Sequence, residues 1–347
     1  PGEGWVGQTA LRLGGAANDE VVIEVTNSGQ ILIAGGAAQF PNAENINDIS
    51  PSNFAFRFNP EDESLIEISP MADGRVDHRS ATMPNGDVVV AGGFGENGIL
   101  LPTVEAYQPS TDTWTTFDSE LQAGVVFHAI ARLKNQGVLS CGGLTAGDSP
   151  NYTSACVKLT PSHQIEPAES MERPLLFTNM ITLADGRVLR SGGLPTLDDH
   201  ASFLPESINA TDEVYIYDQE QWRQVGSMKN ARAMHAATLL PGGRVLLAGG
   251  VTGIHAASAN GEYNGLFYDH GAALACAEIF DPETEEFVSV DACGPSSTGA
   301  TLGEPTVRPA LATDPTFGTV ISGGIGTNRG QSVSDSIVLH PSYSAGN

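Results

Sequence analysis

Arginine and histidine recur in this sequence at one position, a few residues before stretches that alternate small and apolar side chains. An arginine guanidinium can hold a carboxylate or sulfate through two parallel hydrogen bonds, and a histidine can act as a general acid or base. The sharper interpretation is an anion-binding or catalytic ring. The other is architectural, with the same side chains bonded to neighbouring repeats, and recurrence in register favours it. The candidate binding set is His78, Arg79, His128, Arg173, Arg232, His235 and Arg308.

The chain carries an internal repeat that must position these residues. An aliphatic run ending in Gly-Gly occurs six times, at spacings of 57, 50, 50, 57 and 74 residues. Self-similarity at this period is typical of repeat architectures. The markers are Gly35-Gly36, Gly92-Gly93, Gly142-Gly143, Gly192-Gly193, Gly249-Gly250 and Gly323-Gly324.

Each repeat predicts four short β-strands, which we label a to d. A tight turn such as Asn85-Gly86 or Asp185-Gly186 precedes the Gly-Gly strand, and these dipeptides favour β-hairpins because both residues tolerate positive φ. A further alternating run follows each Gly-Gly and leads to an aromatic residue, as from Tyr107 to Trp114. Long segments with helical periodicity are missing. The predicted fold class is therefore all-β, with four-stranded antiparallel blades.

The pattern resembles the kelch repeat: Gly-Gly after an aliphatic strand, a turn such as Phe280-Asp281-Pro282, and then an aromatic residue. The resemblance implies a single six-bladed β-propeller over residues 1–347. We expect residues 5–13 to complete the C-terminal blade, which would join the chain ends and remove an open sheet edge. Such propellers serve as enzymes, binders and scaffolds alike, so the fold does not decide the function.

Charge excludes several partners. The chain has 41 Asp and Glu against 16 Lys and Arg, a net charge of −25. So acidic a protein is unsuited to nucleic acid or to anionic membranes, which attract basic surfaces. Runs of about 18 apolar residues, as a membrane-spanning helix needs, are missing from the sequence. The partners that the charge does not exclude are proteins, glycans and other subunits of an assembly.

The four cysteines are expected to pair within blades. In the blade arrangement, Cys141 ends strand b and Cys156 begins the adjacent strand c, whereas Cys276 and Cys293 flank strands c and d of a later blade. We predict Cys141–Cys156 and Cys276–Cys293. Disulfides imply an oxidising compartment, so the expected location is secreted, cell-surface or periplasmic.

Long b–c and d–a connections are the expected functional surface, because binding residues concentrate on loops held by a rigid scaffold. The candidate loop contacts are Phe40, Phe203, Tyr263, Phe267 and Tyr268. We expect no cofactor. Asp198 and Asp199 could ligate calcium with backbone carbonyls, although a solvated surface is the favoured interpretation.

The favoured function is therefore non-catalytic recognition of a protein or glycan through the long-loop face. One alternative is a sugar-modifying enzyme, by analogy with a kelch-type sialic-acid mutarotase or epimerase that uses arginine and acid/base residues. Another is a purely structural assembly subunit. The galactose oxidase family is disfavoured, because it needs a cysteine crosslinked to tyrosine and the cysteines here are expected to pair.

Overall fold

The computed structural model describes residues 22–37, 50–146, 151–195, 207–255 and 273–288, together with the backbone of short strands between 306 and 339. Within these residues the protein is all-β, and the helical content is a single 3-10 turn, η2 (Glu96–Gly98). This confirms the all-β, antiparallel part of the predicted fold class, while the count of six blades stays a prediction. The Trp5–Leu13 segment lies outside the described residues.

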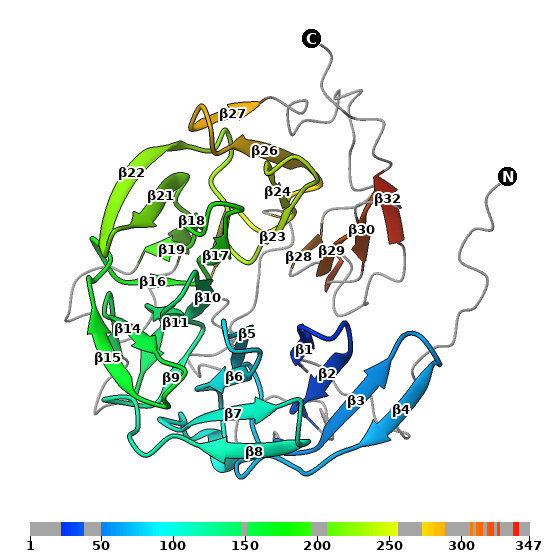
Figure 1. Ribbon diagram of the computed structural model, residues 1–347. Helices are drawn as coiled ribbons and strands as arrows, with labels where there is room; N and C mark the ends of the chain where they lie inside the picture. The colour runs from blue at the N-terminus through cyan, green and yellow to red at the C-terminus, as the bar shows by residue number, and fades with distance from the viewer. Residues whose placement is uncertain are drawn as a thin grey trace, which may run out of the picture.

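The strands form a ring of antiparallel sheets that follow one another along the chain (Figure 1). We number the sheets 1 to 6 in chain order. Among the described residues, sheets 1 to 5 have four strands each, and the first strand of each lies innermost. The strands are, in sheet 1, β1 (Val22–Val25), β2 (Ile31–Ala34), β3 (Ala55–Asn59) and β4 (Ser64–Glu67); in sheet 2, β5 (Arg79–Thr82), β6 (Val88–Ala91), β7 (Val104–Gln108) and β8 (Thr113–Thr116); in sheet 3, β10 (Ala129–Leu133), β11 (Gly137–Cys141), β14 (Cys156–Leu159) and β15 (Ile165–Ala168); in sheet 4, β17 (Asn179–Thr182), β18 (Val188–Ser191), β21 (Glu213–Asp218) and β22 (Gln221–Ser227); and in sheet 5, β23 (Ala236–Leu239), β24 (Val245–Ala248), β26 (Ala277–Asp281) and β27 (Glu286–Val288).

Sheet 6 consists, in the described part of the chain, of β29 (Ala310–Asp314), β30 (Gly318–Ser322) and β32 (Ser336–Leu339). A fourth strand supplied by residues 5–13 remains a prediction, and so does closure of the ring.

One of the two predicted cysteine pairs lies wholly within the described residues. Cys141 and Cys156 are direct register partners on β11 and β14, and they form a disulfide as expected. Cys276 is also disulfide-bonded, whereas Cys293 lies outside the described residues.

A second layer of very short strands sits beside the Gly-Gly end of the sheets, and the sequence reasoning did not predict it. Several of its pairs join the segment after Gly-Gly to the segment before strand a of the same sheet, as in the bridges Val76–Phe94 and Ala233–Val251. Its strands are β9 (Val125–Val126), β12 (Leu144–Thr145), β13 (Asn151–Tyr152), β16 (Leu175–Leu176), β19 (Leu194–Pro195), β20 (Ser207–Asn209), β25 (Gly253–His255), β28 (Thr306–Val307) and β31 (Ile325–Gly326). The β20–β25 pair links sheet 4 to sheet 5.

Gly-Gly joins each sheet to the next by a repeated backbone hydrogen bond. The amide of the second glycine donates to a carbonyl in the connection that leads into the following sheet. The pairs are Gly36 to Arg75 (2.9 Å), Gly93 to Val125 (2.8 Å), Gly143 to Leu175 (3.0 Å) and Gly193 to Arg232 (2.9 Å). The first glycine allows this approach. At Gly92, for instance, a Cβ would lie 2.3 Å from the Val125 carbonyl oxygen.

The apolar core lies between neighbouring sheets. One cluster combines Val89 and Val104 of sheet 2 with Val138 and Leu159 of sheet 3, all buried. Comparable clusters lie between the other adjacent sheets from sheet 1 to sheet 5. Burial of these faces against one another drives the packing of the ring. The glycine approach described above sets how closely the sheets can pack.

The Gly92→Ala substitution tests this constraint. We expect it to destabilise the protein by about 3 kcal/mol, because alanine adds a collision to an unfavourable backbone conformation (φ +65°). Gly29→Ala is the matched control, since Gly29 also has a positive φ (+78°) but an added Cβ there would meet nothing within 4 Å. It should cost only about 1 kcal/mol. Denaturant unfolding measures both, and equal losses would contradict the close-approach explanation.

Candidate functional site

The predicted histidines of the ring are buried between sheets. His78, His128 and His235 expose 2%, 1% and 5% of their surface. Each packs against the Gly-Gly strand of the preceding sheet: a Cβ on Gly35 would lie 2.5 Å from the His78 ring, and one on Gly92 would lie 3.0 Å from the His128 ring. His235 Nε2 is 2.8 Å from Ser191 Oγ, the residue before Gly192. The histidines therefore act as inter-sheet packing groups.

Arg75 and Arg232 are fully buried and form ion pairs in equivalent places. Arg75 donates to Glu105 Oε1 (2.7 Å) and to the Gly92 carbonyl (2.9 Å). Arg232 donates to Glu278 Oε1 (2.6 Å) and to the Gly249 carbonyl (2.9 Å). Each carboxylate also accepts backbone amides from the connection that carries its arginine. These pairs fasten the connection into each sheet to that sheet's own strand c.

In sheet 3 both members of the buried arginine–glutamate pair are replaced together. Val125 occupies the position of Arg75, since its carbonyl accepts the equivalent glycine amide. Val157 pairs with Ser140 as Glu105 pairs with Val90, and therefore occupies the position of the glutamate. An apolar pair thus replaces the ionic pair. This is the arrangement expected if neither charge can be buried without the other.

The other arginines of the ring are also engaged. Arg79 donates to the carbonyls of His128 (3.2 Å) and His78 (3.3 Å). Arg173 pairs with Glu213 and keeps 39% of its side chain exposed. Arg190 was not predicted, yet it is fully buried, pairs with Glu172 (2.9 Å) and lies over the Tyr215 ring. Arg308 lies outside the described residues. The geometry therefore favours the architectural interpretation of the ring.

Burial also sets the protonation of the histidines. It lowers the pKa of His128 to about 3, with the nearby Arg79 charge acting in the same direction. The pKa values of His78 and His235 are likewise held well below 6.5, first by burial and then by Arg75 and Arg232 respectively. All three imidazoles are neutral in the folded protein at neutral pH.

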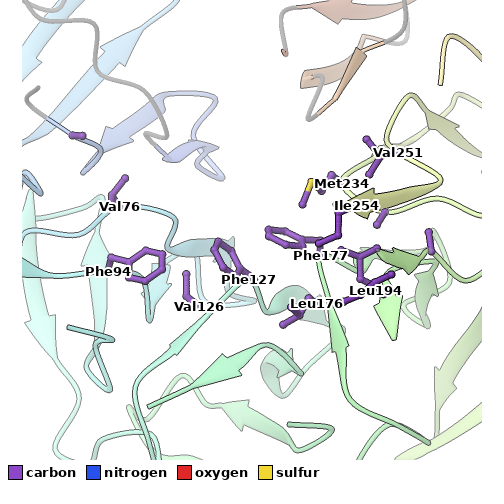
Figure 2. Close-up of a cluster of buried hydrophobic side chains, with 14 residues drawn as sticks. Val76, Phe94, Val126, Phe127, Leu176, Phe177, Leu194, Met234, Val251 and Ile254 are labelled. Atoms are coloured by element: carbon purple, nitrogen blue, oxygen red, sulfur yellow. The ribbon is translucent and has the colours of Figure 1, made fainter. Parts of the chain in front are cut away.

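Apolar side chains gather toward the centre of the ring beside the Gly-Gly ends (Figure 2). Phe127 lies between Phe94 and Phe177, with ring centroids 5.7 and 4.3 Å away. Phe127, Phe177 and Met234 each lie two residues before the start of strand a of their sheets and have positive φ, as does Asp77. The Phe177 amide donates to Phe127, and the Met234 amide to Phe177. We call this buried set the apolar plug: Ala37, Val76, Phe94, Val126, Phe127, Leu176, Phe177, Leu194, Ile208, Ala210, Ala233, Met234, Val251 and Ile254.

A cavity of about 430 Å³ with a mixed polar and apolar lining lies between the inner strands. It is bounded by the later residues of these strands, whereas the apolar plug precedes them, so the two occupy opposite ends of the channel. Its polar lining groups are Glu24, Ser80, Thr82, Arg132, Thr182 and Thr238. Glu24 accepts hydrogen bonds from Ser80 (2.9 Å) and Thr82 (3.4 Å), while burial raises its pKa above the ordinary value. Sequence reasoning missed this site because its members stand in different repeats without a common motif.

Phe40, Asp198, Asp199, Phe203, Tyr263, Phe267 and Tyr268 lie outside the described residues. Among the residues that are described, groups of three or more His, Cys, Asp or Glu side chains suited to a metal ion are missing. Helices long and apolar enough to cross a membrane are also missing from that part of the chain.

Comparison with known families agrees with the repeat pattern. A family model for the kelch motif matches residues 77–118, which begin just before strand β5 and extend past β8. The chain is also 28% identical to mouse (Mus musculus) Kelch-like protein 36 over 253 residues, 72% of its own length. This is a kelch-repeat protein. It spans only 38% of the length of that relative.

Other similarities of the kelch-repeat protein cross functional classes. It is 23% identical to galactose oxidase of Gibberella zeae over 279 residues, 76% of this chain and 37% of the oxidase. Its fold matches the solved structure of YjhT, with a TM-score of 0.65 and 15% identity, covering 93% of this chain and 95% of that one. It also matches a fungal alcohol oxidase determined with copper, with a TM-score of 0.65 and 18% identity, covering 92% and 62%. At these identities the structures support the β-propeller fold alone.

The Arg75–Glu105 pair of the kelch-repeat protein allows a double-mutant test. Arg75→Val or Glu105→Val alone should cost about 3 to 5 kcal/mol, because each leaves an unpaired buried charge. The double variant, which reproduces the valines of sheet 3, should recover most of that loss. Denaturant unfolding of the four proteins measures the coupling. Additive losses would contradict the assignment of the pair as one unit.

The buried histidines predict a specific acid sensitivity. Unfolded histidine binds a proton near pH 6.5, whereas folded His128 does so only near 3, so stability is lost as the pH falls below 6.5. Each such histidine contributes a loss of about 1.4 kcal/mol per pH unit. His128→Phe should remove about that slope, measured as the difference between the variant and wild-type unfolding free energies from pH 6.5 downward. Parallel curves would contradict a neutral, buried His128.

Proposed function

We propose that this kelch-repeat protein is an interaction propeller that binds another protein through the long connections on its Gly-Gly face. The proposal rests on the burial and bonding of the arginines and histidines that the sequence predicted as a binding ring. Its described histidines are buried between sheets, its described arginines are hydrogen-bonded within the scaffold, and the apolar plug lies toward the centre of that face. What the face offers to a partner is therefore its loops, held on rigid strands.

The anchoring of one loop pair supports the same conclusion. Strands β20 and β25 pair with each other, so the connections of sheets 4 and 5 leave the scaffold side by side. Ile208 and Ile254 of these strands are buried in the apolar plug. Loops fixed at their bases lose less conformational entropy on binding than free loops do. The predicted contacts Phe203, Tyr263, Phe267 and Tyr268 fall in these two connections.

An extracellular setting completes the proposal. The Cys141–Cys156 disulfide is suited to an oxidising compartment, and the charge of −25 disfavours nucleic acid and anionic membranes as partners. We therefore place the protein in the secreted, cell-surface or periplasmic class. A surface glycan is the alternative ligand of the same loops.

A structural assembly subunit is the second candidate. Leu65 and Ile66 lie on β4, the outermost strand of sheet 1, and expose 39% and 44% of their surface. Apolar side chains on an outer edge strand suit contact with another subunit. In that case the outer edge, and not the loop face, would carry the contacts.

A loop replacement tests the function. The variant replaces residues 256–272 with a short Gly-Ser linker and keeps β25 and Ala273. The control changes Asn135 and Gln136 to serine in the a–b turn of sheet 3. Both are applied, beside the wild type, to a panel of secreted and surface proteins and to a glycan array.

Protein binding that is lost in the loop variant and kept in the control supports the proposal, provided that the melting temperature is unchanged. Binding to glycans alone would replace the protein partner with the alternative ligand. Binding that survives loop replacement but is lost in Leu65→Ser would favour the assembly subunit. An absence of binding to either panel would overturn the interaction proposal.

A further inference from the structure

The channel cavity contains two opposite charges that do not pair with each other. Glu24 lies on β1 and Arg132 on β10, and both line the 430 Å³ cavity. The ion pairs found within 4.0 Å among the described residues do not include this one. The cavity is therefore lined by one acidic and one basic residue that form no ion pair with each other.

Arg132 stands apart from the other arginines of the described chain. In a protein with 41 acidic residues, most of its arginines have found a carboxylate partner. Those paired are Arg57, Arg75, Arg173, Arg187, Arg190, Arg223, Arg232 and Arg244. The Arg132 guanidinium has no carboxylate within 4.0 Å among the described residues, and the Thr182 hydroxyl donates only to its backbone carbonyl (2.7 Å). Its five N–H donors are available to an anion that enters the cavity.

Glu24 presents the opposite case. Its carboxylate accepts the hydroxyls of Ser80 and Thr82 but has no basic side chain beside it in the described structure. Those hydroxyls hold the carboxylate in place without neutralising it. A bound cation with N–H donors would supply the missing charge.

We infer that the channel cavity binds a small zwitterion of the α-amino acid class, with its carboxylate on Arg132 and its ammonium on Glu24. A simple anion would enter a protein of net charge −25 and face Glu24, and a simple cation would face Arg132. A zwitterion offers a carboxylate to Arg132 and an ammonium to Glu24, and its binding leaves the net charge unchanged. The apolar lining of Ile130, Met180, Ile181 and Leu239 leaves room for an uncharged side chain.

The size and position of the cavity agree with this ligand. Binding pockets for small molecules usually measure about 300 to 1,000 Å³, and this one lies near the lower limit. It lies at the end of the channel away from the apolar plug. The site is therefore separate from the loop face and independent of the proposed partner binding.

Calorimetric titration of the full chain with L-alanine and L-serine tests the inference. Two analogues separate the charges: L-alaninamide lacks the carboxylate, and N-acetyl-L-alanine lacks the ammonium. We expect L-alanine to bind, and each analogue to bind about tenfold more weakly or worse, since each loses one charge-assisted hydrogen-bonded contact. This comparison needs no variant and therefore no assumption about folding.

Two variants then assign the charges. Arg132→Gln and Glu24→Gln should each weaken L-alanine binding by about tenfold or more, while Arg223→Gln, on the outer surface, should bind as the wild type does. Melting curves confirm that each variant is folded. Equal binding of L-alanine and N-acetyl-L-alanine would show an anion site only and overturn the inference. So would the absence of binding by either amino acid, or wild-type affinity in both cavity variants.

Discussion

The approach of each Gly-Gly to the connection of the next sheet is the contact on which the structure depends. The second glycine donates its amide to that connection, and the first has no Cβ to keep the connection away. Both glycines have positive φ, a conformation that glycine adopts without strain. Because this contact repeats, the sheets follow one another at a regular separation, and the residues after each contact are forced into the space between sheets. The burial of the histidines follows from that geometry.

Buried charge is the second consequence. Arg75 and Arg232 reach a space that excludes water, where a lone charge would be very costly, and each meets a glutamate of its own sheet. The same glutamates accept amides from the connection, so each carboxylate is hydrogen-bonded as well as charge-paired. Sheet 3 fills the equivalent space with Val125 and Val157. Sheet 4 has Leu175 and Tyr215 at these positions. The ion pairs are thus one of several solutions to the same packing problem, and the fold does not require them in every sheet.

The two ends of the channel differ in chemistry for a geometrical reason. The inner strands run in one direction, so the residues before them gather at one end and the residues that finish them at the other (Figure 1). Apolar residues before the strands close the first end, and hydroxyl and charged residues line the second. A partner that binds the loops and a small molecule in the cavity would therefore meet different surfaces of one rigid body. The fold by itself does not decide between these uses, because function resides in sites and not in the scaffold.

The sequence by itself determined the features that depend on neighbouring strands. The repeat, the hairpins at Asn85-Gly86 and Asp185-Gly186, and the Cys141–Cys156 disulfide all join segments of one sheet, and local spacing encodes them. The short strands beside Gly-Gly were also within reach, since an apolar residue such as Phe94 or Leu144 follows each marker. Only the tertiary structure decided which ring residues are buried, and that Glu24 and Arg132 share one cavity. These contacts join different repeats, and their distances depend on how the sheets pack around the axis, which no spacing along the chain specifies.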